Sequence, residues 1–135
     1  MQKLSAEPIW IDESSILSIH SRQLAEHGGG DGTRDRGLLA SAINRAKNLY
    51  HYGNPVPYIT DMAAAYAYGI IKNYPFIDGN KRTTLVACRL FLQLNGFDIK
   101  VSQQDKYITF LKLAEGIIGE AELSSWLSVH LVTIN

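Results

Sequence analysis

The chain has 135 residues, the size of one domain, and its 13 basic residues balance 13 acidic ones to a formal net charge of zero. A neutral chain exerts no bulk attraction on nucleic acid or on an anionic membrane, so we expect neither as a direct partner. The single cysteine, Cys88, excludes an internal disulfide and disfavours a cysteine-based zinc site. No stretch has the roughly 20 apolar residues that span a bilayer, and no signal peptide is evident. We expect one cytoplasmic domain over residues 1–135.

The first two predicted elements are helices separated by a glycine-rich loop. Asp12 is a suitable N-cap for a helix that ends near His27. The loop 28–32 has two interpretations, because it can wrap a phosphate or simply end one helix before the next. The absence of a Walker-type Gly-Lys-Ser/Thr sequence favours the structural role. Apolar residues then recur at helical spacing over residues 34–48.

Residues 50–58 contain three tyrosines, two prolines and a Gly-Asn turn signal, which predict a small, irregular, hairpin-like flap. Its aromatic side chains have two equally favoured roles, contacting a ligand or covering the core. A third helix, capped by Thr60 or Asp61, runs to about Asn73. Its many alanines and its glycine predict the close approach of a neighbouring backbone.

The most apolar helical pattern begins at Lys81 and ends at Asn95. Because it is apolar almost all round, we expect this helix to be central and to pack against the third helix. Alternation over residues 97–101 predicts only a small edge strand.

Two more helices complete the prediction. Ser102 and Asp105 resemble a capping box that opens a helix ending near Gly116, and a last helix covers residues 120–132. Five or six helices without a strand ladder predict an all-α domain, a helical bundle of about six helices.

The chemistry of the chain concentrates in the run NYPFIDGNKRT, residues 73–83, which is predicted to enter the N-terminus of the central helix. The free N–H groups of a first helical turn, the helix dipole and two adjacent cations, Lys81 and Arg82, make a plausible phosphate site. Asp78 can supply the carboxylate that Mg²⁺ takes beside phosphate oxygens. The alternative is a helix start capped by Asp78 or Asn80 with both cations solvated, and the residues alone favour the two equally.

The run from Tyr74 to Thr83 resembles the signature of the Fic/Doc family, His-x-Phe-x-Asp/Glu-Gly/Ala-Asn-Gly/Lys-Arg. The resemblance extends in both directions along the chain. Residues 27–35 and 38–43 are similar to the first half of the Doc branch, the "death on curing" toxins, and residues 90–96 complete the match. It implies the all-α Fido fold around a central helix, with ATP and Mg²⁺ as cofactors.

Two positions indicate the Doc branch, because members that transfer AMP usually have Gly in place of Lys81 and Arg in place of Leu85. The resemblance then implies a toxin of a toxin–antitoxin system. Such toxins act as kinases that transfer the ATP γ-phosphate to a threonine of elongation factor Tu and stop translation. Asp78 would hold Mg²⁺, and the nucleotide would contact Gly79, Asn80, Lys81, Arg82 and Thr83. AMP transfer and a non-catalytic peptide-binding module are the alternatives.

Tyr74 departs from the family pattern, because it occupies the position of the catalytic histidine that takes the proton from the target hydroxyl. A phenol with an ordinary pKa near ~10 is a poor base at pH 7, and losing general-base catalysis costs about 10²–10⁴-fold in rate. We therefore expect an inactive or weakened chain, whether Tyr74 is natural or a substitution. No Ser or Thr lies four residues before a Glu, so the Ser/Thr-x-x-x-Glu inhibitory helix of many members is absent. The expected inhibitor is a separate antitoxin peptide segment that folds on binding.

Overall fold

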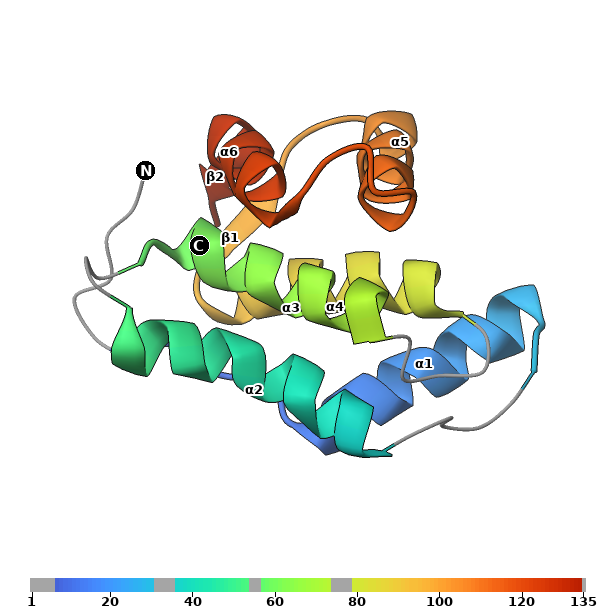
Figure 1. The fold of residues 1–135 in the computed structure, drawn as a ribbon. Helices are drawn as coiled ribbons and strands as arrows, with labels where there is room; N and C mark the ends of the chain where they lie inside the picture. Colours follow the sequence, from blue (N-terminus) through green and yellow to red (C-terminus); the bar gives the residue numbers. More distant parts are fainter. Residues whose placement is uncertain (1–6, 31–35, 54–56, 74–78, 135) are drawn as a thin grey trace.

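The computed structural model describes residues 7–30, 36–53, 57–73 and 79–134. This part of the chain contains six helices and one two-stranded sheet (Figure 1). In chain order the elements are α1 (Glu13–His27), α2 (Arg36–Tyr52), α3 (Ile59–Asn73), α4 (Asn80–Leu94), β1 (Phe97–Ile99), α5 (Gln103–Ala114), α6 (Glu120–His130) and β2 (Leu131–Thr133). The all-α prediction is confirmed. None of the described helices is long and apolar enough to cross a membrane.

The helices form three layers (Figure 1). Helices α1 and α2 form one outer layer, α3 and α4 form the middle, and α5 and α6 with the small sheet form the other side. The middle pair contacts both outer layers, since α3 packs against α2 and α6 while α4 packs against α1 and α5. The predicted central location of α4 is confirmed, and α3 shares it.

Local sequence signals place several helix ends where we predicted them. The carboxylate of Asp12 accepts a hydrogen bond from the backbone N–H of Ser15 at 2.8 Å, which caps α1. Ser102 likewise accepts from the N–H of Asp105 at 3.1 Å and caps α5. Gly28 ends α1 with φ of 77°, a left-handed angle that glycine adopts without strain.

Helix α3 is the most thoroughly buried element, and its small residues explain why. Nearly every position from Ile59 to Ile71 is buried. A Cβ added to Gly69 would stand 3.1 Å from both the Cα and the carbonyl oxygen of Ala42 in α2. The predicted close approach of a neighbouring backbone is therefore confirmed, and at Gly69 the close neighbour is α2. The predicted packing of α4 against α3 is also present.

The inner face of α4 consists of Ala87, Cys88, Phe91 and Leu92, all fully buried. Burial raises the pKa of the Cys88 thiol to about 12, so this cysteine is an inert packing residue at neutral pH.

The predicted flap over residues 50–58 is wrong in its first three residues. Helix α2 continues through Tyr52, because the helix-breaking prolines come only later, and residues 54–56 lie outside the described part of the chain. Of the two roles left open for the tyrosines, covering the core is confirmed for Tyr50. The ring of Tyr50 meets Trp10 edge-on at 5.8 Å, whereas Tyr52 is 83% exposed.

The small strand predicted over residues 97–101 is confirmed as β1, and its partner was missed. Strand β1 pairs antiparallel with β2, with Asp98 opposite Val132. The sequence analysis extended the last helix to Val132, whereas the backbone turns extended at Leu131. The β-branched residues that follow favour a strand, and the N–H of Ile134 continues the pairing by donating to the carbonyl of Gly96 at 2.9 Å.

Candidate functional site

The N-terminus of α4 begins with a glycine that brings two helices close together. Gly79 is the N-cap, with φ of 80° and ψ of 12° in the left-handed region. A Cβ at this position would lie 3.4 Å from the ring carbon Cδ2 of His20 and 3.6 Å from a methyl carbon of Leu24, both in α1. The start of α4 therefore lies directly against the last turns of α1.

The first turn of α4 is strongly positive. Helices α1, α3, α5 and α6 each carry an acidic residue in the first turn, whereas α2 and α4 have none. The glycine N-cap of α4 provides no side-chain cap. Lys81 is exposed and Arg82 is half-buried in this turn. The first N–H groups of any helix have no partner within it and carry the positive end of the dipole. Together these features favour an anion at this end of α4.

Arg82 connects this turn to the glycine-rich loop. Its Nη2 donates a hydrogen bond to the carbonyl oxygen of Gly28 at 3.1 Å, across 54 residues of sequence. Its Nε is buried and has no hydrogen-bond partner among the described residues, and the same is true of the Thr83 hydroxyl oxygen. Buried polar atoms are nearly always hydrogen-bonded in folded proteins. Among the described residues, nothing satisfies these two atoms, and both lie in the turn where the sequence predicts a phosphate site.

The predicted nucleotide-binding residues lie together in the structure. Gly79 caps α4, and the next four residues form its first turn, closed by a hydrogen bond from the N–H of Thr83 to the carbonyl of Gly79 at 3.0 Å. Asn80 is only 8% exposed. Tyr74 and Asp78 lie outside the described residues, so their predicted roles stay predictions. No group of three or more His, Cys, Asp or Glu able to hold a metal occurs within the described ranges.

The sequence analysis missed the contribution of α1 to this site. His20 is buried at 4% exposure and Leu24 lies one turn further along, on the face that begins with buried Ile16. The available signal was a polar residue four positions after Ile16, on the apolar face of the helix. The structural role favoured for the glycine loop is confirmed at Gly28, which ends α1. The hydrogen bond that its carbonyl accepts from Arg82 was not predicted.

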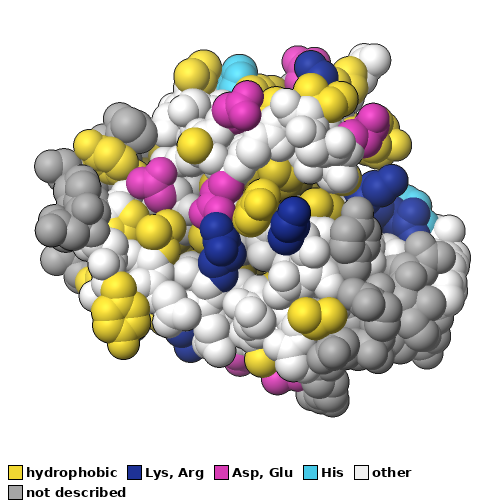
Figure 2. Space-filling model, viewed as in Figure 1, with side chains coloured by type: hydrophobic (Ala, Val, Ile, Leu, Met, Phe, Trp, Pro, Cys, Tyr) yellow, Lys and Arg dark blue, Asp and Glu magenta, His cyan; other side chains and the backbone are white. Residues whose placement is uncertain are grey.

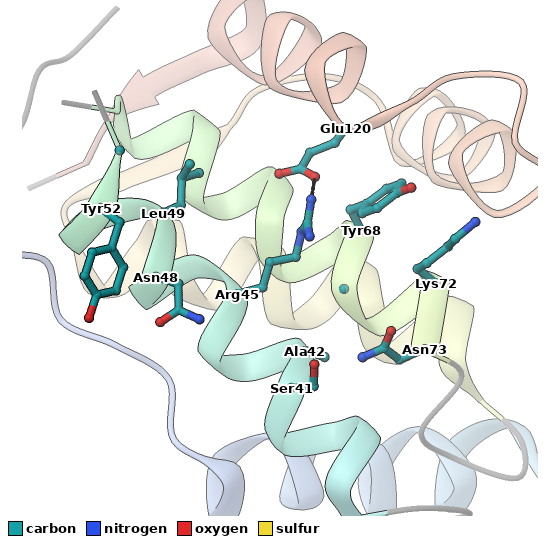
Figure 3. A pocket seen from close by; sticks show the side chains of 12 residues that line it. Ser41, Ala42, Arg45, Asn48, Leu49, Tyr52, Tyr68, Lys72, Asn73 and Glu120 are labelled. Carbon is teal, nitrogen blue, oxygen red and sulfur yellow. Dashed lines mark hydrogen bonds and ion pairs between the residues drawn. The ribbon is translucent and has the colours of Figure 1, made fainter. Parts of the chain in front are cut away.

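Two grooves each combine residues from all three layers. The first, here called the α1–α4 groove, has a volume of about 430 Å³ and is lined by Ile19, Arg22, Gln23, Leu85, Val86, Arg89, Leu90, Gln93, Gln103 and Lys106. The second, the α2–α3 groove, has a volume of about 480 Å³ (Figure 3). It is lined by Ser41, Ala42, Arg45, Asn48, Leu49, Tyr52, Gly53, Tyr68, Gly69, Lys72, Asn73 and Glu120.

A sequence profile of the Fic/DOC family matches residues 10–92, which span α1 to nearly the end of α4 and include the whole described site. The chain belongs to the Fic/DOC family. The resemblance inferred from the sequence motif is thereby confirmed.

Curated Fic/DOC proteins similar to the chain have names describing two different activities. It is 32% identical to "Toxin Doc" of Mycolicibacterium smegmatis over 67% of each chain. It is 27% identical to "Protein kinase doc" of Escherichia phage P1, over 66% of this chain and 70% of that protein. It is also 38% identical to "Protein adenylyltransferase Fic" of Drosophila persimilis, but the match covers 62% of this chain and 16% of the much longer fly protein. Family membership therefore indicates a transferase and leaves the transferred group open.

Proposed function

We propose that this protein is a cytoplasmic Doc-type toxin of a toxin–antitoxin system. In this proposal it transfers the γ-phosphate of ATP to a threonine of elongation factor Tu and so blocks translation. The observation that carries the proposal is the first turn of α4, which has no acidic residue and two adjacent cations. It also has two buried polar atoms for which the described residues offer no partner. The two Doc relatives, which the chain matches over two thirds or more of their length, support the toxin branch.

The chemistry assigned to the site is positioning and charge neutralisation, which phosphoryl transfer chiefly requires. Lys81 and Arg82 would neutralise phosphate oxygens, with N–H groups of the first turn directed at the same oxygens. Asp78 is the proposed Mg²⁺ ligand, because Mg²⁺ takes one or two carboxylates beside phosphates. When bound, Mg²⁺–ATP supplies the transferable phosphoryl group and a divalent charge that stabilises the leaving phosphate.

Leu85 favours phosphate transfer over AMP transfer. It is half-buried, packs against the core and lines the α1–α4 groove, so it places no cation where AMP-transferring members usually have a second Arg. Lys81 adds a charge to the first turn where those members have Gly. Lys81 and Leu85 both lie in α4, and both differ from the residues that AMP-transferring members usually have there.

The experiment restores the family histidine and follows the label. Purified Tyr74→His protein is incubated with elongation factor Tu and with ATP labelled at the α or the γ position. We expect γ label on the factor, at a rate about 10²–10⁴-fold above that of the unchanged chain, because a general base has been restored. Adding Arg82→Ala should abolish transfer, whereas Lys100→Ala, which changes an exposed cation beyond β1, should not.

Each contrary outcome identifies a different error. Transfer of α label would make the protein an AMP transferase. Failure of folded Tyr74→His protein to transfer either label would contradict the proposal. A toxic Tyr74→His form whose toxicity survives Asp78→Ala would indicate a non-catalytic binding module.

We further propose that the antitoxin segment occupies the α1–α4 groove. Ile19, Val86 and Leu90 form an apolar strip there, with cationic side chains on its borders. An amphipathic helix with acidic flanks matches this chemistry. Val86→Asp should weaken capture of the antitoxin encoded beside the toxin gene, while Leu94→Asp, a change at a residue already 41% exposed, should leave it unchanged. Equal capture by both variants would exclude the groove.

A further inference from the structure

The α2–α3 groove is long and open. It runs along α2 from Ser41 to Gly53, a distance of about 18 Å at the helical rise of roughly 1.5 Å per residue. Figure 3 shows Arg45 reaching across it from α2, with Tyr68 and Lys72 projecting from α3 and Tyr52 at the opposite end. A trough of this length suits an extended polypeptide of about five or six residues, at roughly 3.3 Å each.

The charge of the groove is positive. Glu120 is the only acidic side chain among the lining residues, and it is ion-paired to Arg45. The guanidinium of Arg45 also lies 5.0 Å from the centre of the Tyr68 ring, a cation–π arrangement that holds it over the groove. Lys72 is exposed, so one positive charge remains after the pair is counted. Figure 2 shows Lys and Arg side chains beside acidic ones in the middle of this face.

The remaining lining residues have the composition of a protein-binding surface. Tyr52 is 83% exposed although it is a large aromatic residue, and Asn48, one helical turn before it, is exposed as well. Tyrosine and arginine are enriched at interfaces because they combine a large contact area with polar groups. Tyr52 makes little contribution to the core, so its side chain is exposed for contact with a partner.

One end of the groove lies at the end of α3, shortly before the proposed phosphate site in the sequence. Lys72 and Asn73 line the groove there, and Asn80 begins α4 seven residues after Asn73. Seven residues of chain span at most roughly 25 Å, which sets the largest possible separation between this end of the groove and the first turn of α4.

We propose that the α2–α3 groove binds an extended, acidic segment of the protein that is phosphorylated, and so helps to select the acceptor. This inference rests on the proposed function. The acceptor fits better than the antitoxin, because the α1–α4 groove is the one that offers an apolar strip, and no residue lines both grooves.

The test uses Tyr74→His protein as the parent and elongation factor Tu as the acceptor. Adding Lys72→Glu or Tyr52→Ala should raise the KM for the acceptor about tenfold. Lys72→Glu reverses the charge that complements an acidic segment, and Tyr52→Ala removes part of the contact surface. Neither should change kcat at saturating acceptor or the KM for ATP. Lys72→Arg should restore the parent value. Lys112→Glu makes the same charge reversal at an exposed lysine of α5 and is the matched control.

The outcomes separate the two proposals. If the parent transfers phosphate and both groove variants keep its acceptor KM, the groove is not the docking site and the proposed function stands. An equal rise with Lys112→Glu would attribute the effect to net charge and also overturn the inference. Loss of ATP affinity in Lys72→Glu would place that lysine in the nucleotide site instead. A parent that transfers nothing overturns both proposals.

Discussion

At the scale of single residues, the carboxylate of Asp98 accepts several hydrogen bonds from neighbouring side chains. Its two oxygens accept hydrogen bonds from Nε and Nη2 of Arg89, at 2.9 and 3.0 Å, and a third bond comes from Gln93 at 3.2 Å. The Arg89 hydrogen bonds are the largest cause of a pKa lowered to about 2. The ion pair ties β1 to α4, and its charged form is favoured by folding.

Asp98→Asn tests this contribution. A lowered folded-state pKa stabilises the fold above the unfolded value near ~4, and the stabilisation is lost as pH falls toward 2. The pair is partly exposed, with Arg89 at 38%, so screening limits the effect to about 1 kcal/mol. Urea unfolding should show this loss at pH 7 and a weaker decline below pH 4 in the variant. Glu115→Gln, which removes an exposed charge, should follow the unchanged chain.

Tyr66 is the second residue whose contribution to the free energy of unfolding can be measured. It is fully buried, which raises its pKa to about 12, and its hydroxyl accepts a hydrogen bond from the N–H of Ile11 at 3.1 Å. This bond fastens the segment before α1 to α3.

Tyr66→Phe should lower the free energy of unfolding by about 1–2 kcal/mol, because the buried Ile11 N–H loses its partner. Tyr107→Phe, at a residue 62% exposed, is the control in the same denaturation assay. Equal stability of the two variants would mean that water replaces the lost partner.

At the scale of elements, α2 and α3 come close together at Gly69. Gly69→Ala should destabilise the protein by a net of about 1 kcal/mol. Overpacking costs about 1–3 kcal/mol, and the better helix propensity of alanine returns about 1 kcal/mol. The midpoint of thermal unfolding should fall by a few degrees, roughly 3–5 °C. Ser125→Ala, on the exposed face of α6, is the control and should raise the unfolding midpoint slightly through helix propensity alone. A rise in the midpoint of Gly69→Ala as well would show that α2 can move away from the added methyl group.

Most elements were predictable because their signals are local. The caps of α1 and α5 and the apolar period of α4 each lie within a few residues of sequence. Two errors came from the lack of a local signal. Residues 50–52 continue α2 because tyrosine and histidine do not break a helix, and Leu131 leaves α6 because β1, more than 30 residues earlier, offers backbone partners.

At the scale of the whole molecule, zero net charge predicts poor colloidal stability near neutral pH. His27 and His51 are exposed, so changing both to Lys adds two positive charges at the surface and adds repulsion between molecules. Static light scattering at pH 7 should show less self-association of this variant than of the unchanged chain. Equal scattering of the two proteins would contradict this expectation.

The candidate site shows the same division between local and long-range information. The first turn of α4 could be predicted, because Gly79 to Thr83 are consecutive. The contacts of His20 with Gly79 and of Arg82 with Gly28 could not, because each joins residues more than 50 positions apart through the packing of α1 on α4. The grooves are likewise products of helix packing, and each combines residues from three helices.

The burial of Cys88 has a practical consequence for studying this protein. It is the only cysteine in the chain, it is inaccessible, and its thiol remains protonated at neutral pH. Thiol-reactive dyes should therefore leave the native protein unlabelled. In an Asn48→Cys variant the new cysteine, at an exposed position of the groove, would react alone. A fluorophore attached there would report on occupancy of the groove without removal of the natural cysteine.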